Sequence, residues 1–387
     1  MSNKTKRPEW APEEGGNGFA CRVMDGVEGG HDGISSYTGT GSQKPANRYR
    51  RVQLSAENYA DGVLNGNRAI LGRAITLVES NAMAHVDLAQ DVLKILLPHT
   101  GKSMRVGITG VPGVGKSTFI EALGCYLLER GHRVAVLAVD PSSIISGGSI
   151  LGDKTRMELL GRDERCFIRP SPAGGTLGGV ARKTRETMLV CEAAGFDVIL
   201  VETVGVGQSE VAVRSMVDFF LLLMLAGAGD ELQGIKKGIM ELADALVINK
   251  ADGNNKIFAQ TARNEYERAL HYLQPATEGW VSHAYTCSAA KKQGIDNIWN
   301  VIEKFRAITT KSGVFEKNRR NQNVKWVHEM IGEHLRSLFA KHPEVIKILS
   351  DIEEAVADGT MPAVAAVQQL IDVFEGKRYM DGKQTRV

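Results

Sequence analysis

The segment that most constrains the possible fold of this chain is Gly110-Val-Pro-Gly-Val-Gly-Lys116-Ser117. It fits the phosphate-loop pattern of Gly, four residues and Gly-Lys-Ser. The apolar run Val106 to Thr109 predicts a strand before it, and Thr118 to Arg130 predicts an amphipathic helix after it. Loop glycines let backbone N–H groups turn toward a β-phosphate, and the helix N-terminus adds partial positive charge. The predicted nucleotide-binding residues here are Gly110, Pro112, Gly113, Val114, Gly115, Lys116, Ser117 and Thr118.

Two side chains of this loop carry its predicted chemistry. Lys116 is expected to neutralise oxygens of the β- and γ-phosphates, and Ser117 is expected to place its hydroxyl on Mg²⁺. A glycine turn before a buried helix is the alternative. The order of strand, loop, Lys and Ser favours nucleotide binding over that alternative.

A second motif, Asn249-Lys250-Ala-Asp252, ends an apolar run and predicts the choice of base. The carboxylate of Asp252 can accept hydrogen bonds from guanine N1–H and the exocyclic amine, a donor pair that adenine lacks. Asn249 can bind the other edge of the base, and the aliphatic stem of Lys250 can cover its face. These three residues are therefore predicted to select guanine.

A Ser-Ala pair follows the next predicted strand, His283 to Thr286. In GTPases, a Ser-Ala pair at this place gives a backbone N–H to guanine O6, although the pair alone is a weak signal. The predicted contacts with the base are Ser288, Ala289 and Ala290.

Three acidic residues are candidates for a magnesium site. Glu202 ends an apolar strand, and Gly205 behind it could meet the γ-phosphate. Asp140 ends another predicted strand, and Asp153 follows a Gly/Ser-rich loop. Single acids at strand ends are often caps or solvated groups. Because these three accompany a phosphate loop, we predict that they bind the metal together with Ser117, and Glu202 could also orient the attacking water.

Five further segments have a distinctive wording: Val139-Asp-Pro-Ser-Ser143, Gly152-Asp-Lys-Thr-Arg-Met157, Ser171-Pro-Ala-Gly-Gly-Thr-Leu-Gly-Gly179, Glu202-Thr-Val-Gly-Val-Gly-Gln208 and Gly229-Asp-Glu-Leu-Gln-Gly-Ile-Lys236. Together with the two motifs above, they resemble the MeaB/ArgK family of GTPases, which includes methylmalonic aciduria type A proteins. The resemblance runs from about Leu54 to Phe374.

This resemblance implies a G-protein chaperone that gates cofactor loading and protects or reactivates an adenosylcobalamin-dependent acyl-CoA mutase, chiefly methylmalonyl-CoA mutase. It implies GTP/GDP and Mg²⁺ as cofactors, and a third switch over Ala226 to Lys237 that responds to the mutase. It also implies that the C-terminal helices form a homodimerisation arm. The residues expected to be catalytic are Lys116, Glu202 and Lys236.

Two other functions stay open at this point. A metallochaperone GTPase would call for a His-rich tract or a Cys/His site near the switches, whereas the nine histidines are scattered. A transport-associated small-molecule kinase could use the same phosphate loop, but it would need no guanine selector.

The formal net charge of +2 favours neither general nucleic-acid binding nor membrane attraction. The five cysteines show no metal spacing and are expected to be reduced thiols, with Cys125 and Cys287 buried. No apolar signal segment is visible at the N-terminus, and Phe219 to Ala226 is too short to span a bilayer. We therefore expect a cytoplasmic enzyme.

Four regions are predicted. Residues 1–50 form a disordered tail, residues 51–102 a helical segment, and residues 103–311 an α/β P-loop GTPase domain with a mostly parallel central sheet between helices. Residues 312–387 form the C-terminal helical dimerisation arm and tail. Pro343 and Pro362 divide this last region into helices.

An apolar stripe at helical spacing marks the first C-terminal helix. It is predicted either to join the intramolecular core or to meet a second copy, and it consists of Val324, Val327, Ile331, Leu335 and Leu338. The basic pair Arg319-Arg320 is expected to lie in a solvated loop.

Overall fold

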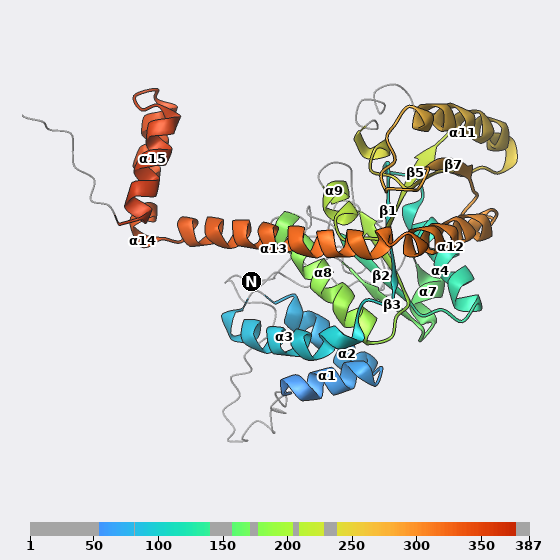
Figure 1. Cartoon of the computed structure of the whole chain (residues 1–387), viewed down its shortest axis with the longest axis horizontal. Helices are drawn as coiled ribbons and strands as arrows, with labels where there is room; N and C mark the ends of the chain where they lie inside the picture. The colour runs from blue at the N-terminus through green and yellow to red at the C-terminus, as the bar shows by residue number, and fades with distance from the viewer. Residues whose placement is uncertain are drawn as a thin grey trace, which may run out of the picture. The chain divides into compact units, whose positions relative to one another are not determined.

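The sheet is the centre of the molecule. A computed structural model describes residues 54–80, 82–139, 157–170, 177–203, 209–227 and 238–376. In these ranges, seven parallel strands form one sheet in the order β3-β2-β4-β1-β5-β6-β7 (Figure 1). Their bounds are β1 Met104–Gly110, β2 Val134–Val139, β3 Cys166–Arg169, β4 Val198–Thr203, β5 Phe219–Leu225, β6 Ala245–Asn249 and β7 His283–Thr286. The predicted parallel sheet is confirmed.

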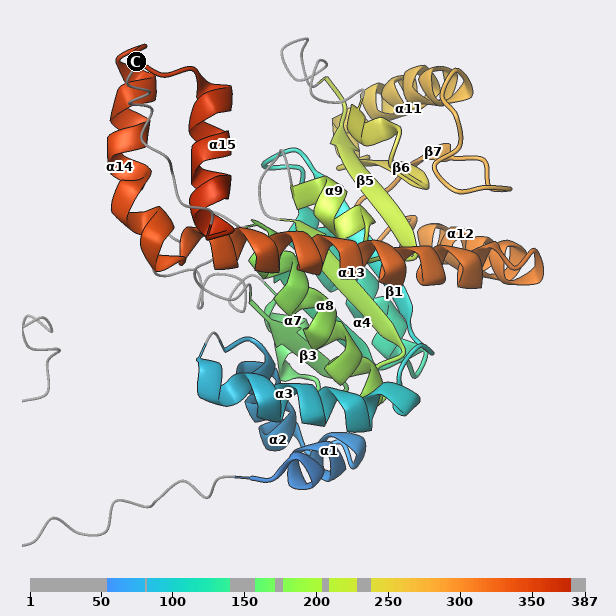
Figure 2. The same ribbon diagram turned by 60° about the vertical axis from the view of Figure 1, so that its left-hand side comes forward.

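Helices cover both faces of this sheet, which is why its strands read as continuous apolar runs (Figure 2). One core joins the strands to α4 (Lys116–Glu129), α7 (Glu158–Arg162) and α12 (Ile295–Lys311). The core on the other face joins them to α1 (Ala56–Leu64), α2 (Arg68–Val78), α3 (Met83–Leu96), α8 (Leu177–Ala193) and α9 (Ser209–Arg214). Helix α11 (Lys256–His271) packs beside β6 and β7. Short 3₁₀ turns, η1 (Leu97–His99) and η3 (Gly253–Asn255), precede β1 and α11.

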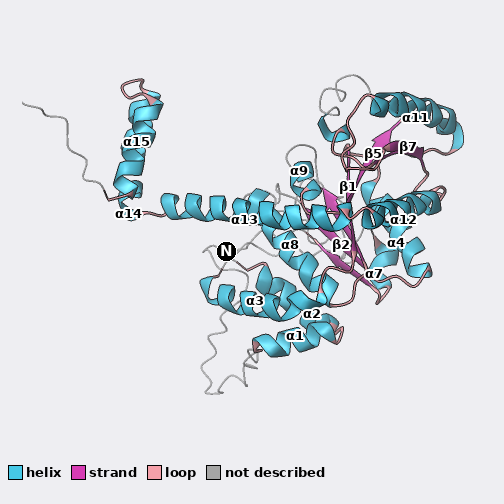
Figure 3. Ribbon diagram, viewed as in Figure 1, coloured by secondary structure: helices cyan, strands magenta, loops and turns pink. Residues whose placement is uncertain are grey.

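Three helices follow the sheet domain: α13 (Val314–Ala340), α14 (Pro343–Ala357) and α15 (Ala363–Phe374) (Figure 3). Pro343 starts α14 and Pro362 is the N-cap of α15, as the sequence predicted. Helices α14 and α15 pack on each other through a small core that contains Ile352 and Leu370. The apolar stripe of α13 stays outside the core, because its five residues are 47–59% exposed.

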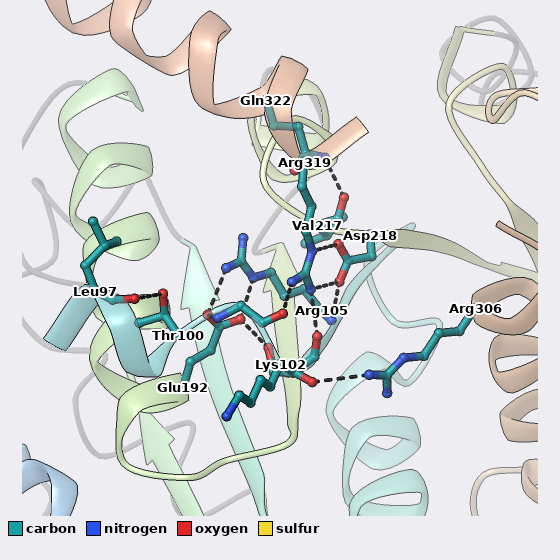
Figure 4. Close-up of polar contacts among 12 residues, drawn as sticks. Leu97, Thr100, Lys102, Arg105, Glu192, Val217, Asp218, Arg306, Arg319 and Gln322 are labelled. Carbon is teal, nitrogen blue, oxygen red and sulfur yellow. Dashed lines mark hydrogen bonds and ion pairs between the residues drawn. The ribbon is translucent and has the colours of Figure 1, made fainter. Parts of the chain in front are cut away.

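The first turns of α13 are held at the amino ends of β1 and β5 by a network of ion pairs and hydrogen bonds (Figure 4). The guanidinium of Arg319 donates to both oxygens of Asp218, at 2.7 Å each, and to the carbonyl oxygen of Ser103. Asp218 also accepts from the backbone N–H of Arg105, whose side chain pairs with the buried carboxylate of Glu192. The expectation that Arg319 lies in a solvated loop is therefore wrong: it lies in a helix, with its charge paired.

The structure also tests the predicted burial of the thiols and the prediction that no segment spans a membrane. Cys166, Cys191 and Cys287 are buried free thiols, and burial raises the pKa of Cys166 and Cys287 to about 12. Cys125 is only half-buried, so the expectation that it is buried holds in part. In the described ranges, no helix combines the length and the apolar character that a membrane crossing requires.

Candidate functional site

The predicted motifs meet because parallel strands all end at the same edge of the sheet. Strand β1 ends at Gly110, Glu202 is the last residue but one of β4, and β6 ends at Asn249. Strand β1 lies between β4 and β5, and Ile108 stands opposite Glu202 in the register of β1 and β4. The described residues at these strand ends therefore lie at one edge of the sheet.

The phosphate loop needs glycine at two positions of its turn. Gly110 has φ +155°, and a Cβ there would lie 2.4 Å from the carbonyl oxygen of Leu223 on β5. Gly115 has φ +92° and is the N-cap from which α4 begins at Lys116. Between them, Val114 is fully buried and fixes the loop against the core. The loop therefore presents the N-terminus of a 14-residue helix, which is a ready anion site.

The side chains of the loop lie where phosphate and metal chemistry would need them. The ammonium of Lys116 donates to the carbonyl oxygen of Gly110 at 2.9 Å, and burial lowers its pKa against the opposing charges of Glu202 and Glu210. The hydroxyl of Ser117 donates to Glu202 at 3.2 Å, and Glu202 is only 5% exposed. A hydroxyl beside a buried carboxylate offers the hard oxygen ligands that Mg²⁺ prefers, so this pair fits the predicted metal.

Asn249 joins the base motif to the phosphate loop. Its amide nitrogen donates to the carbonyl oxygen of Val114 at 2.8 Å, and its amide oxygen accepts from the backbone N–H of Ala289 at 3.1 Å. The Sγ of Cys287 lies 3.4 Å from the same oxygen. Asn249, the last residue of β6, therefore links the phosphate loop to the loop after β7. Direct contact with a base stays a prediction.

Asp252 and Lys250 complete the base side of the site. The hydroxyl of Ser288 donates to one oxygen of Asp252, which orients the carboxylate. Lys250 adopts φ +60°, and its ammonium donates to the carbonyl oxygen of Gly113 at 2.8 Å. The sequence motifs, 137 residues apart at this contact, are therefore joined by direct bonds.

Four predicted site residues lie outside the described residues: Asp140, Asp153, Gly205 and Lys236. Among the residues that the structure describes, no group of three or more His, Cys, Asp or Glu side chains is placed to hold a metal ion. The metal site can therefore be built here only as far as Ser117 and Glu202.

Sequence reasoning missed Glu210. This residue lies in the first turn of α9 and is fully buried, and its charge acts on the pKa of Lys116. No local pattern in the sequence places this acid near the phosphate loop, because only the folded chain brings its charge close to Lys116.

Comparison with known proteins supports the same assignment. The family model "Methylmalonyl Co-A mutase-associated GTPase MeaB" matches residues 71–344. A putative GTPase of Caulobacter vibrioides is 53% identical over 321 residues, which cover 83% of this chain and 98% of the relative. The mitochondrial methylmalonic aciduria type A homolog of Mus musculus is 44% identical over 84% of this chain and 81% of its own length.

A solved structure agrees with these relatives. The crystal structure of a LAO/AO transport system kinase matches with a TM-score of 0.68 and 40% identity, over 83% of this chain and 97% of that chain. The site geometry, the family model and these relatives lead to one conclusion: the chain belongs to the MeaB family of GTPases.

Proposed function

We propose that this protein binds and hydrolyses GTP with Mg²⁺ and acts as a chaperone of an adenosylcobalamin-dependent acyl-CoA mutase, most plainly methylmalonyl-CoA mutase. The observation that carries the nucleotide part is the brace made by Asn249, which bonds to the phosphate loop at Val114 and to the base loop at Ala289. The mutase part is supported by the description of the family.

The residues near the phosphate loop have complementary roles in this proposal. Lys116 is a partly desolvated cation, so it gains strongly from a phosphate anion that replaces its bond to the Gly110 carbonyl. Ser117 and Glu202 would hold Mg²⁺, which when bound neutralises charge on the β- and γ-phosphate oxygens. Asp252, oriented by Ser288, would accept the two guanine donors.

Slow hydrolysis by the free protein is part of the proposal. No Gln follows Gly205 directly, because Val206 and Gly207 come before Gln208. A partner would supply the missing order and charge, as activating proteins do in other GTPases by factors of about 10³–10⁵. Lys236 in the predicted third switch is the residue we propose to act when the partner docks.

Steady-state hydrolysis with and without a purified adenosylcobalamin-dependent mutase tests this function. We expect the mutase to accelerate GTP hydrolysis, Lys236→Ala to keep the basal rate while losing most of the acceleration, and EDTA to stop both reactions. ATP serves as the control nucleotide and should be hydrolysed poorly. GTP hydrolysis that no candidate mutase alters would leave a GTPase but remove the chaperone role.

We also propose that the protein is a homodimer. The exposed aliphatic stripe of α13, from Val324 to Leu338, belongs to none of the hydrophobic clusters of the described residues. Five large apolar side chains along one helix face form the kind of surface that a second helix covers.

A further inference from the structure

A groove of about 790 Å³ opens between α8, α9 and α13, and none of the described residues of the candidate nucleotide site lines it. Figure 2 shows α13 running past α8 and α9. The middle of α13 forms one wall, and α8 and α9 form the other. Its lining combines charged and apolar side chains, among them Arg182, Arg185, Val211, Trp326, Met330 and Arg336.

Arg185 is a buried cation in this groove, and its hydrogen-bond acceptors are neutral. It is 6% exposed, and its guanidinium donates to the carbonyl and the hydroxyl of Ser215, at 2.7 and 2.8 Å, and to the carbonyl of Gln322 at 3.2 Å. Its Nε donates to no acceptor in the described part of the chain. Burial lowers the pKa of Arg185 to about 10, although the carboxylate of Glu329 opposes the shift.

A second donor beside the groove also lacks an acceptor. The guanidinium carbon of Arg185 lies 5.5 Å from the ring centroid of Trp326, and the indole N–H of Trp326 is buried with no partner within the described ranges. A buried donor without an acceptor costs about 1–3 kcal/mol. Two adjacent side chains thus have unused donor capacity at one place.

The remaining charges of the groove add to the positive potential. Arg182 and Arg336 line it and form no ion pair with a described carboxylate. Lys325 is 4.0 Å from Glu329, and Glu333 is the other acid in the lining. Among the described lining residues, four cations therefore face two carboxylates, over a surface of Trp326, Met330, Val211 and alanines.

We propose that this groove binds a small organic anion. Its carboxylate or phosphate group pairs with Arg185, and its apolar body lies along Trp326, Met330 and Val211. A guanidinium away from water binds such groups strongly, because the charge-assisted bonds replace a hydration shell that burial has already removed. The volume falls in the range of about 300–1,000 Å³ that is usual for small-molecule sites.

The groove is separate from the surface proposed for dimerisation. Successive residues of a helix are rotated by about 100°, so Lys325, Glu329 and Arg336 lie on one side of α13. The stripe that contains Val327 and Ile331 lies on the opposite side. A second copy packed on that stripe therefore leaves the groove open. The proposal of an anion site does not depend on the residues proposed to bind GTP and Mg²⁺.

Calorimetry on the full chain saturated with Mg²⁺ and GDP tests this site, because the nucleotide fills the phosphate loop. The probes are octanoate, octyl phosphate and octan-1-ol, which share a tail and differ in the head group. We expect octanoate or octyl phosphate to bind once per chain, and octan-1-ol to bind at least about 10-fold more weakly. The better of the two anions identifies the head group.

Matched variants locate the binding. Arg185→Gln should weaken the better anion by about 10-fold or more and leave octan-1-ol unchanged. Arg182 and Arg336 form no ion pair with a described carboxylate. The double variant Arg182→Gln with Arg336→Gln therefore tests the charge of the groove even where Arg185→Gln loses its fold. Arg306→Gln, an exposed arginine of α12 outside the groove, is the control and should bind normally.

Three results overturn the proposal. The first is that neither anion binds at millimolar concentration. The second is that octan-1-ol binds as well as the anions, because the negative charge of the head group would then add nothing to the affinity. The third is that the double variant binds the better anion as tightly as wild type does.

Discussion

At the scale of single residues, Asn249 links recognition of the base to recognition of the phosphates. Its two amide atoms bond to loops that lie far apart in the sequence, at Val114 and at Ala289. Because Asn249 is 2% exposed, those bonds are shielded from water. A displacement of the loop at Val114 is therefore transmitted through Asn249 to the loop at Ala289, and the reverse also holds.

The exchange Asp252→Asn tests base choice. We expect GTP affinity to fall by about 1.5–3 kcal/mol, because an amide donor then faces the guanine amine, and xanthosine triphosphate should bind instead. The Ser288 hydroxyl can still donate to the new amide oxygen, so the loop should keep its shape. Calorimetry with both nucleotides measures the change, with the exposed Asp358→Asn as control. Unaltered GTP affinity would show that Asp252 does not contact the base.

The exchange Glu192→Gln tests the pH dependence of stability. Burial alone would raise the pKa of Glu192, but bonds from Arg105, Ser103 and the N–H of Gly101 outweigh it and hold the pKa below its ordinary value of 4.5. The stabilising contribution is therefore complete above pH 4.5 and is lost as the pH falls through the lower folded-state value.

Urea unfolding between pH 7 and pH 3 measures this effect. We expect Glu192→Gln to lose about 3–5 kcal/mol at pH 7, because it leaves Arg105 without its buried partner. The difference from wild type should shrink on acidification below pH 4.5. The exposed Glu353→Gln is the control, and a difference that stays constant with pH would exclude the ionised carboxylate as its cause.

At the scale of elements, α13 is a helix with three different environments. Its first turns are held by Arg319 and Gln322, its middle borders the groove through Trp326, and its aliphatic stripe is exposed. Helix propensity alone cannot produce this division, since the charged and apolar residues of α13 are all compatible with a helix. The contacts of each turn decide its role.

The adjacent pair Arg319 and Arg320 offers a matched test of this attachment. Arg319→Met should lower stability by about 3–5 kcal/mol, because Asp218, with a side chain only 2% exposed, loses its bidentate partner. Hydrogen exchange in residues 314–326 should rise well above that of wild type. Arg320→Met, on the exposed neighbour, should change neither quantity. Equal protection of these residues in both variants would mean that the ion pair does not hold the helix.

The same region shows where sequence reasoning succeeds and where it stops. Strand ends, glycine turns and prolines act locally, so the phosphate loop, β7 and the starts of α14 and α15 were predicted closely. The pairing of Arg319 with Asp218 spans 101 residues and has no local signature. The approach of buried Glu210 to Lys116 was missed for the same reason: folding, and not spacing, brings the two charges together.

At the scale of the whole molecule, the division of α13 predicts the assembly state. Paired Ile331→Asp and Leu335→Asp substitutions put two charges on the exposed stripe and should convert a dimer of twice 42.0 kDa into a monomer. Light scattering after size exclusion measures the mass. Ala340→Asp adds a charge on the groove side of the same helix and should stay dimeric. A wild-type protein that is monomeric at micromolar concentration would contradict the assembly.

The ion network at the base of α13 also has a mechanical consequence. Arg105, which Asp218 and Glu192 engage, lies on the strand that ends at Gly110, about 17 Å away at the usual rise per residue. Tension applied to the C-terminal helices therefore enters the sheet at the foot of β1 and its neighbour β5. Strand β1 leads directly into the phosphate loop at Gly110. A force applied to the C-terminal helices is therefore transmitted along β1 to the phosphate loop.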